Sequence, residues 1–194
     1  MSLSPSTPRS GLLNTEQRWG SAAILFHWIT ALVILGLFGL GLWMVELDYY
    51  DAWYQRAPAI HKAAGILLGL WLLLRLGWRL LTPDPDPVYA HTPMQRFLAH
   101  VAHVGMYILI FALIVTGYLI STADGRGIDV FGWFEAPGFG EFIVNQEDIA
   151  GEVHEWLAYI LMAIVGVHAV AAIYHQFIQK DGTLGRMWFQ RPRR

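Results

Sequence analysis

Four long blocks of apolar residues constrain this chain more than any other feature. Each block has 22 to 26 residues, and the blocks are Ser21–Met44, Ile60–Leu81, Phe97–Ser121 and Val153–Ile178. A helix of that length crosses a hydrocarbon core of about 30 Å at about 1.5 Å per residue. Because backbone groups in lipid have to pair within the chain, we expect an all-α fold. The prediction is a four-helix transmembrane bundle in a single domain covering residues 1–194.

The composition agrees with lipid as the main solvent. Hydrophobic residues make up 55% of the chain and charged residues only 14%, whereas a soluble domain has about a quarter charged residues. The first block is too long for the apolar part of a signal peptide and has no small-residue cleavage motif after it, so we interpret it as the first span. We therefore expect membrane lipids as partners and no nucleic acid.

The connections between the blocks have distinct compositions. Thr82–Pro87 alternates proline and aspartate, which predicts a turn. Residues 122–152 form the longest connection and are rich in glycine, acidic and aromatic residues. We expect this outer loop to carry short surface structure.

Basic residues are distributed unequally between the two sides of the expected bundle. Three lie on one side, Arg56, Lys62 and Arg126. Ten lie on the side of the termini: Arg9, Arg18, Arg75, Arg79, Arg96, Lys180, Arg186, Arg191, Arg193 and Arg194. The positive-inside rule then predicts that both termini of this multi-pass protein are cytoplasmic. Eleven of the fifteen acidic residues lie on the outer side.

Histidines are the main chemical feature of the apolar blocks. The chain has no cysteine, which excludes disulfides, iron–sulfur clusters and covalently attached haem. Ionisable residues inside spans are costly, so they usually face the bundle interior and have a function. Six of the eight histidines fall within spans: His27, His61, His100, His103, His154 and His168. A seventh, His175, falls in the last turns of the fourth block.

The depth of each histidine in the membrane predicts its partner. His61 and His154 begin spans at the outer face, whereas His27 begins the first span at the cytoplasmic face. His168 lies fourteen residues after His154, which is about 21 Å deeper and about 40° away around the same helix. The fourth helix thus offers one imidazole to each membrane face. We expect an outer pair of His61 with His154 and an inner pair of His27 with His168.

Two facing imidazoles suit the iron of a haem better than zinc. A pair of axial nitrogens completes six-coordinate iron in a porphyrin, whereas zinc usually takes three or four protein ligands. We therefore predict two haem b groups, one at each pair. Arg75 lies fourteen residues after His61, towards the inner face, and suits an inner haem propionate because its guanidinium fork donates two bonds to a carboxylate. The alternative for Arg75, and the favoured interpretation of Arg79, is an arginine that snorkels to lipid phosphate.

The motifs around these histidines resemble a known family. They are Arg18-Trp-Gly with Phe26-His27-Trp28, Ile60-His61-Lys62 with Arg75 and Arg79, Leu98-Ala99-His100-Val101-Ala102-His103, Val153-His154-Glu155, Gly166-Val167-His168-Ala169, and Lys180-Asp181-Gly182-Thr183-Leu184 with Arg186-Met187. Together they resemble the bacterial cytochrome b561 family, compact four-helix membrane cytochromes that include superoxide oxidase. The resemblance implies a multi-pass protein of the bacterial inner membrane. It also implies haem b ligation by His27, His61, His154 and His168. It also implies ubiquinone binding near the inner haem, at the positions matching His103 and His175, where a near-neutral pKa suits proton transfer. Hydrogen bonding to propionates or between helices is the alternative for these two.

Two haems at opposite faces would carry electrons across the membrane. The resemblance implies superoxide as the outer donor and ubiquinone as the inner acceptor, hence a superoxide:ubiquinone oxidoreductase. Superoxide is an anion, and an acidic face slows its approach, so Lys62 and Arg126 are predicted to form a small positive funnel. A second hypothesis is an electron-transfer subunit that links a soluble periplasmic redox protein to the quinone pool. A third is a non-redox protein whose histidines bind metal or transport ions.

Overall fold

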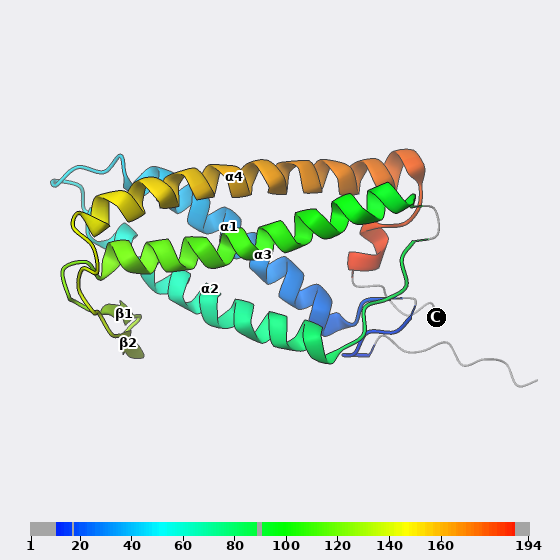
Figure 1. The fold of residues 1–194 in the computed structure, drawn as a ribbon, viewed down its shortest axis with the longest axis horizontal. Coiled ribbons are helices and arrows are strands. Elements are labelled where there is room, and N and C mark those ends of the chain that lie inside the picture. Colours follow the sequence, from blue (N-terminus) through cyan, green and yellow to red (C-terminus); the bar gives the residue numbers. More distant parts are fainter. Residues whose placement is uncertain (1–10, 17, 89–90, 189–194) are drawn as a thin grey trace, which may run out of the picture.

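The computed structural model describes residues 11–16, 18–88 and 91–188, and within them it contains four long helices. These are α1 (Ser21–Met44), α2 (Arg56–Leu81), α3 (Pro93–Ser121) and α4 (Gln146–Tyr174). The four run side by side along the long axis of the molecule (Figure 1). All four are long and apolar enough to cross a membrane. The predicted all-α four-helix transmembrane bundle is confirmed.

Three helices begin earlier than predicted, four residues for α2 and α3 and seven for α4. The start of α3 is set by Thr92, whose hydroxyl accepts a bond from the backbone N–H of Gln95 at 3.3 Å, while the Gln95 side chain accepts one from the Thr92 N–H at 2.8 Å. This capping box satisfies two unpaired backbone donors, and Pro93 at the first helical position suits the start of a helix. Polar caps of this kind lie outside the apolar pattern, so counting apolar residues places the helix starts too late.

The start of α4 shortens the outer loop to residues 122–145. Asn145 has a left-handed backbone conformation with φ 59°, and Glu147 and Asp148 occupy the first turn of the helix. Acidic side chains there are stabilised by the helix dipole. The predicted boundary at residue 153 was wrong because these acidic residues belong to the helix and not to the loop.

The surface of the bundle is apolar and its interior is small. Most of the large side chains on the helices are exposed, as expected where lipid covers them. Leu68 and Leu72 of α2, Ile110 of α3 and Leu161 of α4 form the buried core. Leu161 lies seven residues from both His154 and His168, so this apolar core separates the two predicted histidine layers.

The outer loop forms a short β-hairpin, which agrees with the prediction of short surface structure in this loop. Strands β1 (Ile128–Val130) and β2 (Phe134–Ala136) pair antiparallel, with Val130 opposite Phe134. The turn between them needs positive φ at Phe131 and Gly132, 54° and 73°. Strand β1 lies against the first turns of α2 (Figure 1), and the side chains of Ile128 and Val130 are buried. The hairpin thus covers the region beside His61.

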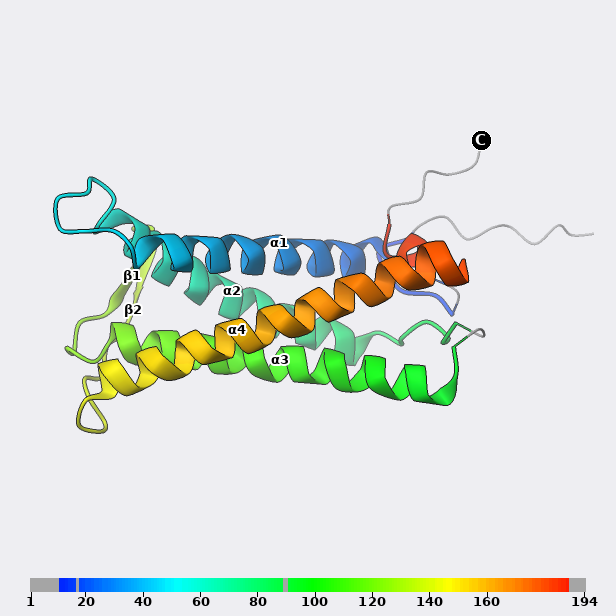
Figure 2. The same ribbon diagram turned by 90° about the horizontal axis from the view of Figure 1, so that it is seen from above.

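The end of the bundle at which α1 begins is called the inner end here, after the predicted orientation, and the opposite end the outer end. The inner end is closed by segments far apart in the sequence. α4 continues as a π-helix, η1 (His175–Gln179), and the chain then reverses into a short 3₁₀ helix, η2 (Leu184–Met187). The indole N–H of Trp28 donates to the Met187 carbonyl at 2.8 Å, and Arg186 donates to the Asp86 carbonyl at 2.9 Å. The start of α1 and the end of α4 therefore lie at the same end (Figure 2).

Candidate functional site

The outer end of the bundle holds His61 of α2 and His154 of α4, whose ring centres are 6.2 Å apart. Both side chains are half-buried. The His61 ring also lies beside the backbone of α1, next to Leu37 and Gly41. The two imidazoles predicted to pair at the outer face therefore do lie side by side.

Thr116 of α3 orients His154. Its hydroxyl lies 2.9 Å from the Ala112 carbonyl and 3.0 Å from Nδ1 of His154. The single hydroxyl hydrogen is directed to a backbone carbonyl, so the oxygen accepts a bond from the Nδ1–H of His154. The proton on Nδ1 leaves the Nε2 lone pair free to bind a metal. The sequence does not predict this role, because the contact of Thr116 with His154 depends on how α3 is rotated towards α4.

Two glycines make room for the outer imidazoles. A methyl group added at Gly117 would lie 3.2 Å from Cε1 of His154, and one added at Gly41 would lie 3.4 Å from Cε1 of His61. The contact at Gly117 would push the His154 ring by a few tenths of an ångström, whereas the contact at Gly41 is at the limit of ordinary van der Waals distance. Gly117 in particular thus leaves room for the His154 ring.

The inner end holds His27 of α1 and His168 of α4, whose ring centres are 6.3 Å apart. A third imidazole, His103 of α3, lies 5.2 Å from His168. The inner site therefore differs from the outer one, since three half-buried histidines from three helices meet there. Trp28 packs edge-on against His27 at 5.3 Å and links this layer to the C-terminal segment.

Two arginines of α2 lie towards the inner end, in different environments. Arg75 is half-buried near His27 and His103, with its guanidinium 5.4 Å from the ring centre of Tyr107. Arg79 forms an ion pair with Asp84 at 3.1 Å. Arg75 is thus placed beside the inner histidines, as a partner for a propionate requires, whereas Arg79 is held by the turn that follows α2.

Both imidazole pairs fit a metal held between two rings. A metal-bound imidazole nitrogen lies about 2.0–2.1 Å from the metal, and the ring centre lies about 1 Å further back, so two rings on opposite sides of one ion have centres about 6 Å apart. The observed separations are 6.2 Å and 6.3 Å. The contact of Thr116 with Nδ1 of His154 and the close approach of Gly117 to the same ring agree with this arrangement.

The residues of the predicted funnel lie at the outer end, where acidic groups offset their charge. Lys62 and Asp129 line a cavity of about 280 Å³ between α2 and the hairpin. Arg126 is 86% exposed and forms an ion pair with Asp124. Hydrogen bonds from Arg126 lower the pKa of the Asp124 carboxyl, and the positive charge of Lys62 contributes to the same shift. Lys62 and Arg126 therefore gather around one carboxylate, which neutralises part of the funnel.

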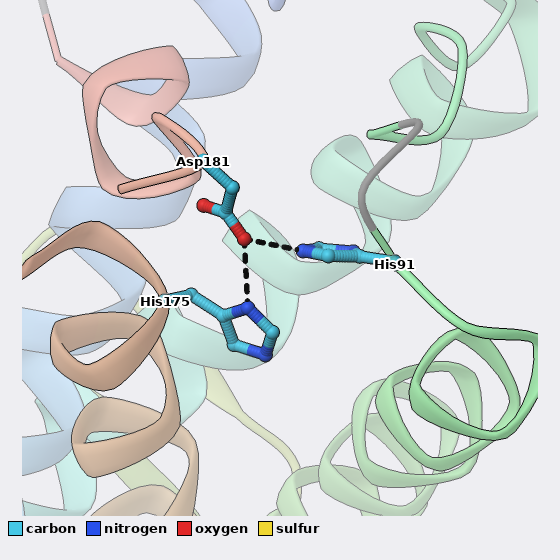
Figure 3. A group of neighbouring side chains, drawn as sticks. All are labelled: His91, His175 and Asp181. Atoms are coloured by element: carbon cyan, nitrogen blue, oxygen red, sulfur yellow. Dashed lines mark hydrogen bonds and ion pairs between the residues drawn. The ribbon is translucent and has the colours of Figure 1, made fainter. Parts of the chain in front are cut away.

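His103 and His175, predicted to share a quinone, lie in different environments. His103 packs on His168, whereas Nδ1 of His175 lies 2.7 Å from Oδ2 of Asp181, which also lies 2.8 Å from Nε2 of His91 (Figure 3). No hydrogen bond or ring contact joins His103 to His175 within the described part of the chain. The cluster of His91, His175 and Asp181 was not predicted, because it joins the connection between α2 and α3 to the segment that follows α4.

Four apolar helices long enough to cross a membrane define the class of multi-pass membrane proteins, and this one has an imidazole pair near each end of its bundle. Residues 18–190 match the sequence model of the family described as "Prokaryotic cytochrome b561". The chain belongs to this family, as its motifs indicated. It is therefore a membrane cytochrome that binds haem b and transfers electrons across the membrane. This membership excludes the hypothesis of a non-redox protein.

Curated relatives give the same family over nearly the whole chain. "Cytochrome b561 homolog 2" of Escherichia coli (strain K12) is 47% identical over 174 residues, which cover 90% of this chain and 93% of that protein. "Probable superoxide oxidase CybB" of Yersinia pestis is 30% identical over 173 residues, covering 89% and 96%. "Cytochrome b561 homolog 1" of Escherichia coli (strain K12) is 28% identical over 187 residues, covering 91% and 98%.

The contact between Thr116 and His154 gives a testable prediction. Thr116→Val keeps the shape of the side chain and removes the oxygen that accepts from the Nδ1–H. We expect the variant to bind its outer haem about 10- to 100-fold more weakly, as is typical when a residue that orients a metal ligand is lost. Haem retention during dilution of the purified protein measures this effect. Thr116→Ser, which keeps the oxygen, is the matched control, and equal retention in the two variants would remove this role from Thr116.

Proposed function

We propose that this protein oxidises superoxide at its outer face and reduces ubiquinone at its inner face, with two haem b groups between them. The balanced reaction is two superoxide anions, one ubiquinone and two protons giving two dioxygen molecules and one ubiquinol. Bound haem b supplies a one-electron carrier at each end. The Yersinia pestis relative supports this proposal through its description as a probable superoxide oxidase.

One observation carries the proposal. Helix α4 contributes His154 to the outer imidazole pair and His168 to the inner pair, and the two are fourteen residues apart. We propose that His61 and His154 would hold the outer haem, and that His27 and His168 would hold the inner haem. A rigid helix then holds both ligands at a fixed spacing of about 21 Å.

The remaining residues of the proposed site act on substrates and propionates. Arg75 would bind a propionate of the inner haem as a fork of two donors. His103 and His175 would donate hydrogen bonds to ubiquinone and supply its protons. Because the two histidines lie in different environments, we propose that each serves a different carbonyl of the quinone. Lys62 and Arg126 would attract superoxide to the outer haem.

The proposed orientation places both termini in the cytoplasm of a bacterium, with the chain as one inner-membrane domain. Arg18, Arg75, Arg79, Arg96, Lys180 and Arg186 support this orientation, because they lie at the end where α1 begins and α4 ends. Arg9, Arg191, Arg193 and Arg194, which also entered the prediction, lie outside the described residues. Of the basic residues that the structure describes, three lie at the opposite end, namely Arg56, Lys62 and Arg126.

Stopped-flow spectroscopy of the purified protein tests the proposed reaction. When superoxide is mixed with the protein, we expect the absorbance change that marks the reduction of haem b. A water-soluble ubiquinone analogue should then reverse it, with ubiquinol as the product. Superoxide dismutase added before mixing is the control and should abolish the change. Reduction that persists with dismutase, or that the quinone does not reverse, would contradict the proposal.

The charges around Lys62 predict opposite effects for two substitutions. Arg126→Glu adds negative charge at the outer face, whereas Asp124→Asn removes it and frees Arg126 from its ion pair. We expect superoxide-driven reduction to slow by roughly twofold to tenfold in the first variant and to accelerate in the second, because surface charge changes the encounter rate of an anion. Both effects should shrink as salt is added, and haem content should stay unchanged. Equal rates in the two variants at low salt would exclude the funnel.

A second function has its own support in the acidity of the outer side. Eleven of the fifteen acidic residues lie there, against three basic ones. Such a surface suits a basic soluble redox protein that delivers electrons to the outer haem. This alternative predicts copurification of a periplasmic partner and strong salt dependence of its electron transfer. A reduction rate by superoxide that exceeds the rate with any such protein favours the first proposal.

A further inference from the structure

Three metal-ligating side chains from three separate segments meet at the inner end of the bundle, away from both imidazole pairs. His91 comes from the connection between α2 and α3, His175 from the first position of η1, and Asp181 from the reversal that follows η1 (Figure 3). One ligand atom of each, Nε2 of His91, Nδ1 of His175 and Oδ2 of Asp181, lies within 4.8 Å of the other two. The contact between His91 and Asp181 spans ninety residues.

The backbone around Asp181 is shaped to aim its carboxylate at the histidines. Lys180 and Gly182 have left-handed conformations, with φ 54° and 78°. The Asp181 N–H donates to the His175 carbonyl at 3.2 Å, which folds the chain back on η1. π-Helical turns such as η1 are rare and frequently mark functional sites. The geometry thus brings Asp181 against an imidazole only six residues earlier.

The two carboxylate oxygens of Asp181 have separate partners. Oδ1 accepts from the N–H of Thr183 at 2.9 Å and from its hydroxyl at 2.6 Å. Oδ2 faces Nε2 of His91 at 2.8 Å and Nδ1 of His175 at 2.7 Å. Thr183 therefore orients the carboxylate through the oxygen that a metal would not use. Partners of this kind are typical around metal ligands.

Burial and charge also suit a cation. The Asp181 side chain has no accessible surface, while His91 and His175 keep 16% and 15% of theirs. Burial alone would raise the pKa of the Asp181 carboxyl, but hydrogen bonds from Thr183, His91 and His175 outweigh it and lower the pKa well below its usual range. The carboxylate is thus ionised at neutral pH. Arg96 donates to the backbone carbonyl of His91 at 3.0 Å. The positive charge of Arg96 would moderately weaken the binding of a cation.

We propose that His91, His175 and Asp181 form a binding site for a divalent cation of the zinc class. Two imidazoles and one carboxylate match the ligands of zinc sites that keep a fourth, open position, whereas calcium and magnesium prefer oxygen ligands alone. Zinc ligands lie about 3.3 Å from one another when each is about 2.0–2.1 Å from the metal. The present N···O distances of 2.8 Å and 2.7 Å need to lengthen by only about 0.5 Å. Binding would release the imidazole protons that now face Oδ2.

Zinc titration of the haem-loaded protein tests this site. The protein is purified without a histidine tag and titrated by competition with a chromophoric zinc chelator. We expect one saturable site in the natural protein and at least about tenfold weaker binding in His91→Gln. Glutamine keeps an N–H near Oδ2 but is a poor zinc ligand, so the loop can stay attached while the site is lost. X-ray absorption at the zinc edge should show nitrogen and oxygen ligands only.

His100→Ala is the matched control. His100 is an exposed imidazole on α3 at the same end of the bundle, outside the cluster, so its loss should leave zinc binding unchanged. Haem absorbance of every variant reports whether it folds. Zinc affinity that is equal in the natural protein and in His91→Gln, or the lack of any saturable site, would overturn the proposal. Nδ1 of His175 would bind the cation, so Nε2 is the atom that would donate to ubiquinone in the proposed function. The titration uses neither superoxide nor quinone, so its failure is distinguishable from a failure of the proposed reaction.

Discussion

Replacing His168 by alanine is expected to remove the inner haem and leave the outer one in place. The haem content of the purified variant should fall from about two to about one per chain, because one of two axial nitrogens is lost. Superoxide should still cause an absorbance change of haem b reduction, but the ubiquinone analogue should no longer reverse it at the normal rate. Pyridine haemochrome assay against protein concentration measures the stoichiometry.

His103 makes this experiment sharper, since its ring lies only 5.2 Å from that of His168. His103→Ala removes an imidazole of the same layer that we place beside the quinone and not on the iron. We expect this control to keep both haems and to lose quinone-dependent reoxidation. The reverse pattern, with haem lost in His103→Ala and retained in His168→Ala, would transfer the ligand role to His103.

Replacing His61 by alanine should have the opposite pattern. The variant should lose the outer haem, keep the inner one and no longer be reduced rapidly by superoxide. His154 would then keep its bond to Thr116 but face no second imidazole across 6.2 Å. Reduction from the quinone side should persist, because His27 and His168 are unchanged. Rapid-mixing spectra with superoxide and with a ubiquinol analogue separate the two routes.

His100→Ala again serves as the control, because it removes one exposed histidine without touching either pair. Gly117→Leu offers a second route to the same result. The Cβ of any side chain at this position would lie 3.2 Å from Cε1 of His154. The larger leucine should therefore displace the ring and release the outer haem. If His61→Ala keeps the superoxide-dependent rate of the natural protein, electrons do not enter through the outer pair.

The paired depth of the histidines could be predicted from sequence because it depends on helix geometry alone. Spans that alternate in direction place His61 with His154 and His27 with His168, and the fixed rise per residue supplies the depth. The side-by-side rings in the structure follow from that arithmetic. The β-hairpin could be expected as surface structure in a loop rich in glycine, but its strands could not be located, since Phe131 has an unusual positive φ.

Other parts of the site depend on contacts that no local pattern predicts. The bond from His154 to Thr116 depends on the rotation of α3 against α4. The meeting of His91 with Asp181 joins a loop to the segment after the last span, and composition does not reveal such a pairing. Arg126 was predicted to attract anions, but the turn after α3 places Asp124 against it. Interactions between separate segments, and polar partners in loops, are the features that required the structure.

The haem content of the natural protein tests the central claim most directly. We predict about two haem b per chain by pyridine haemochrome assay, because each end of the bundle offers one pair of imidazoles. The matching measurement is the protein concentration of the same sample by amino-acid analysis. A purified, folded protein that carries a single haem, or none, would contradict the assignment of one bis-imidazole site to each membrane face.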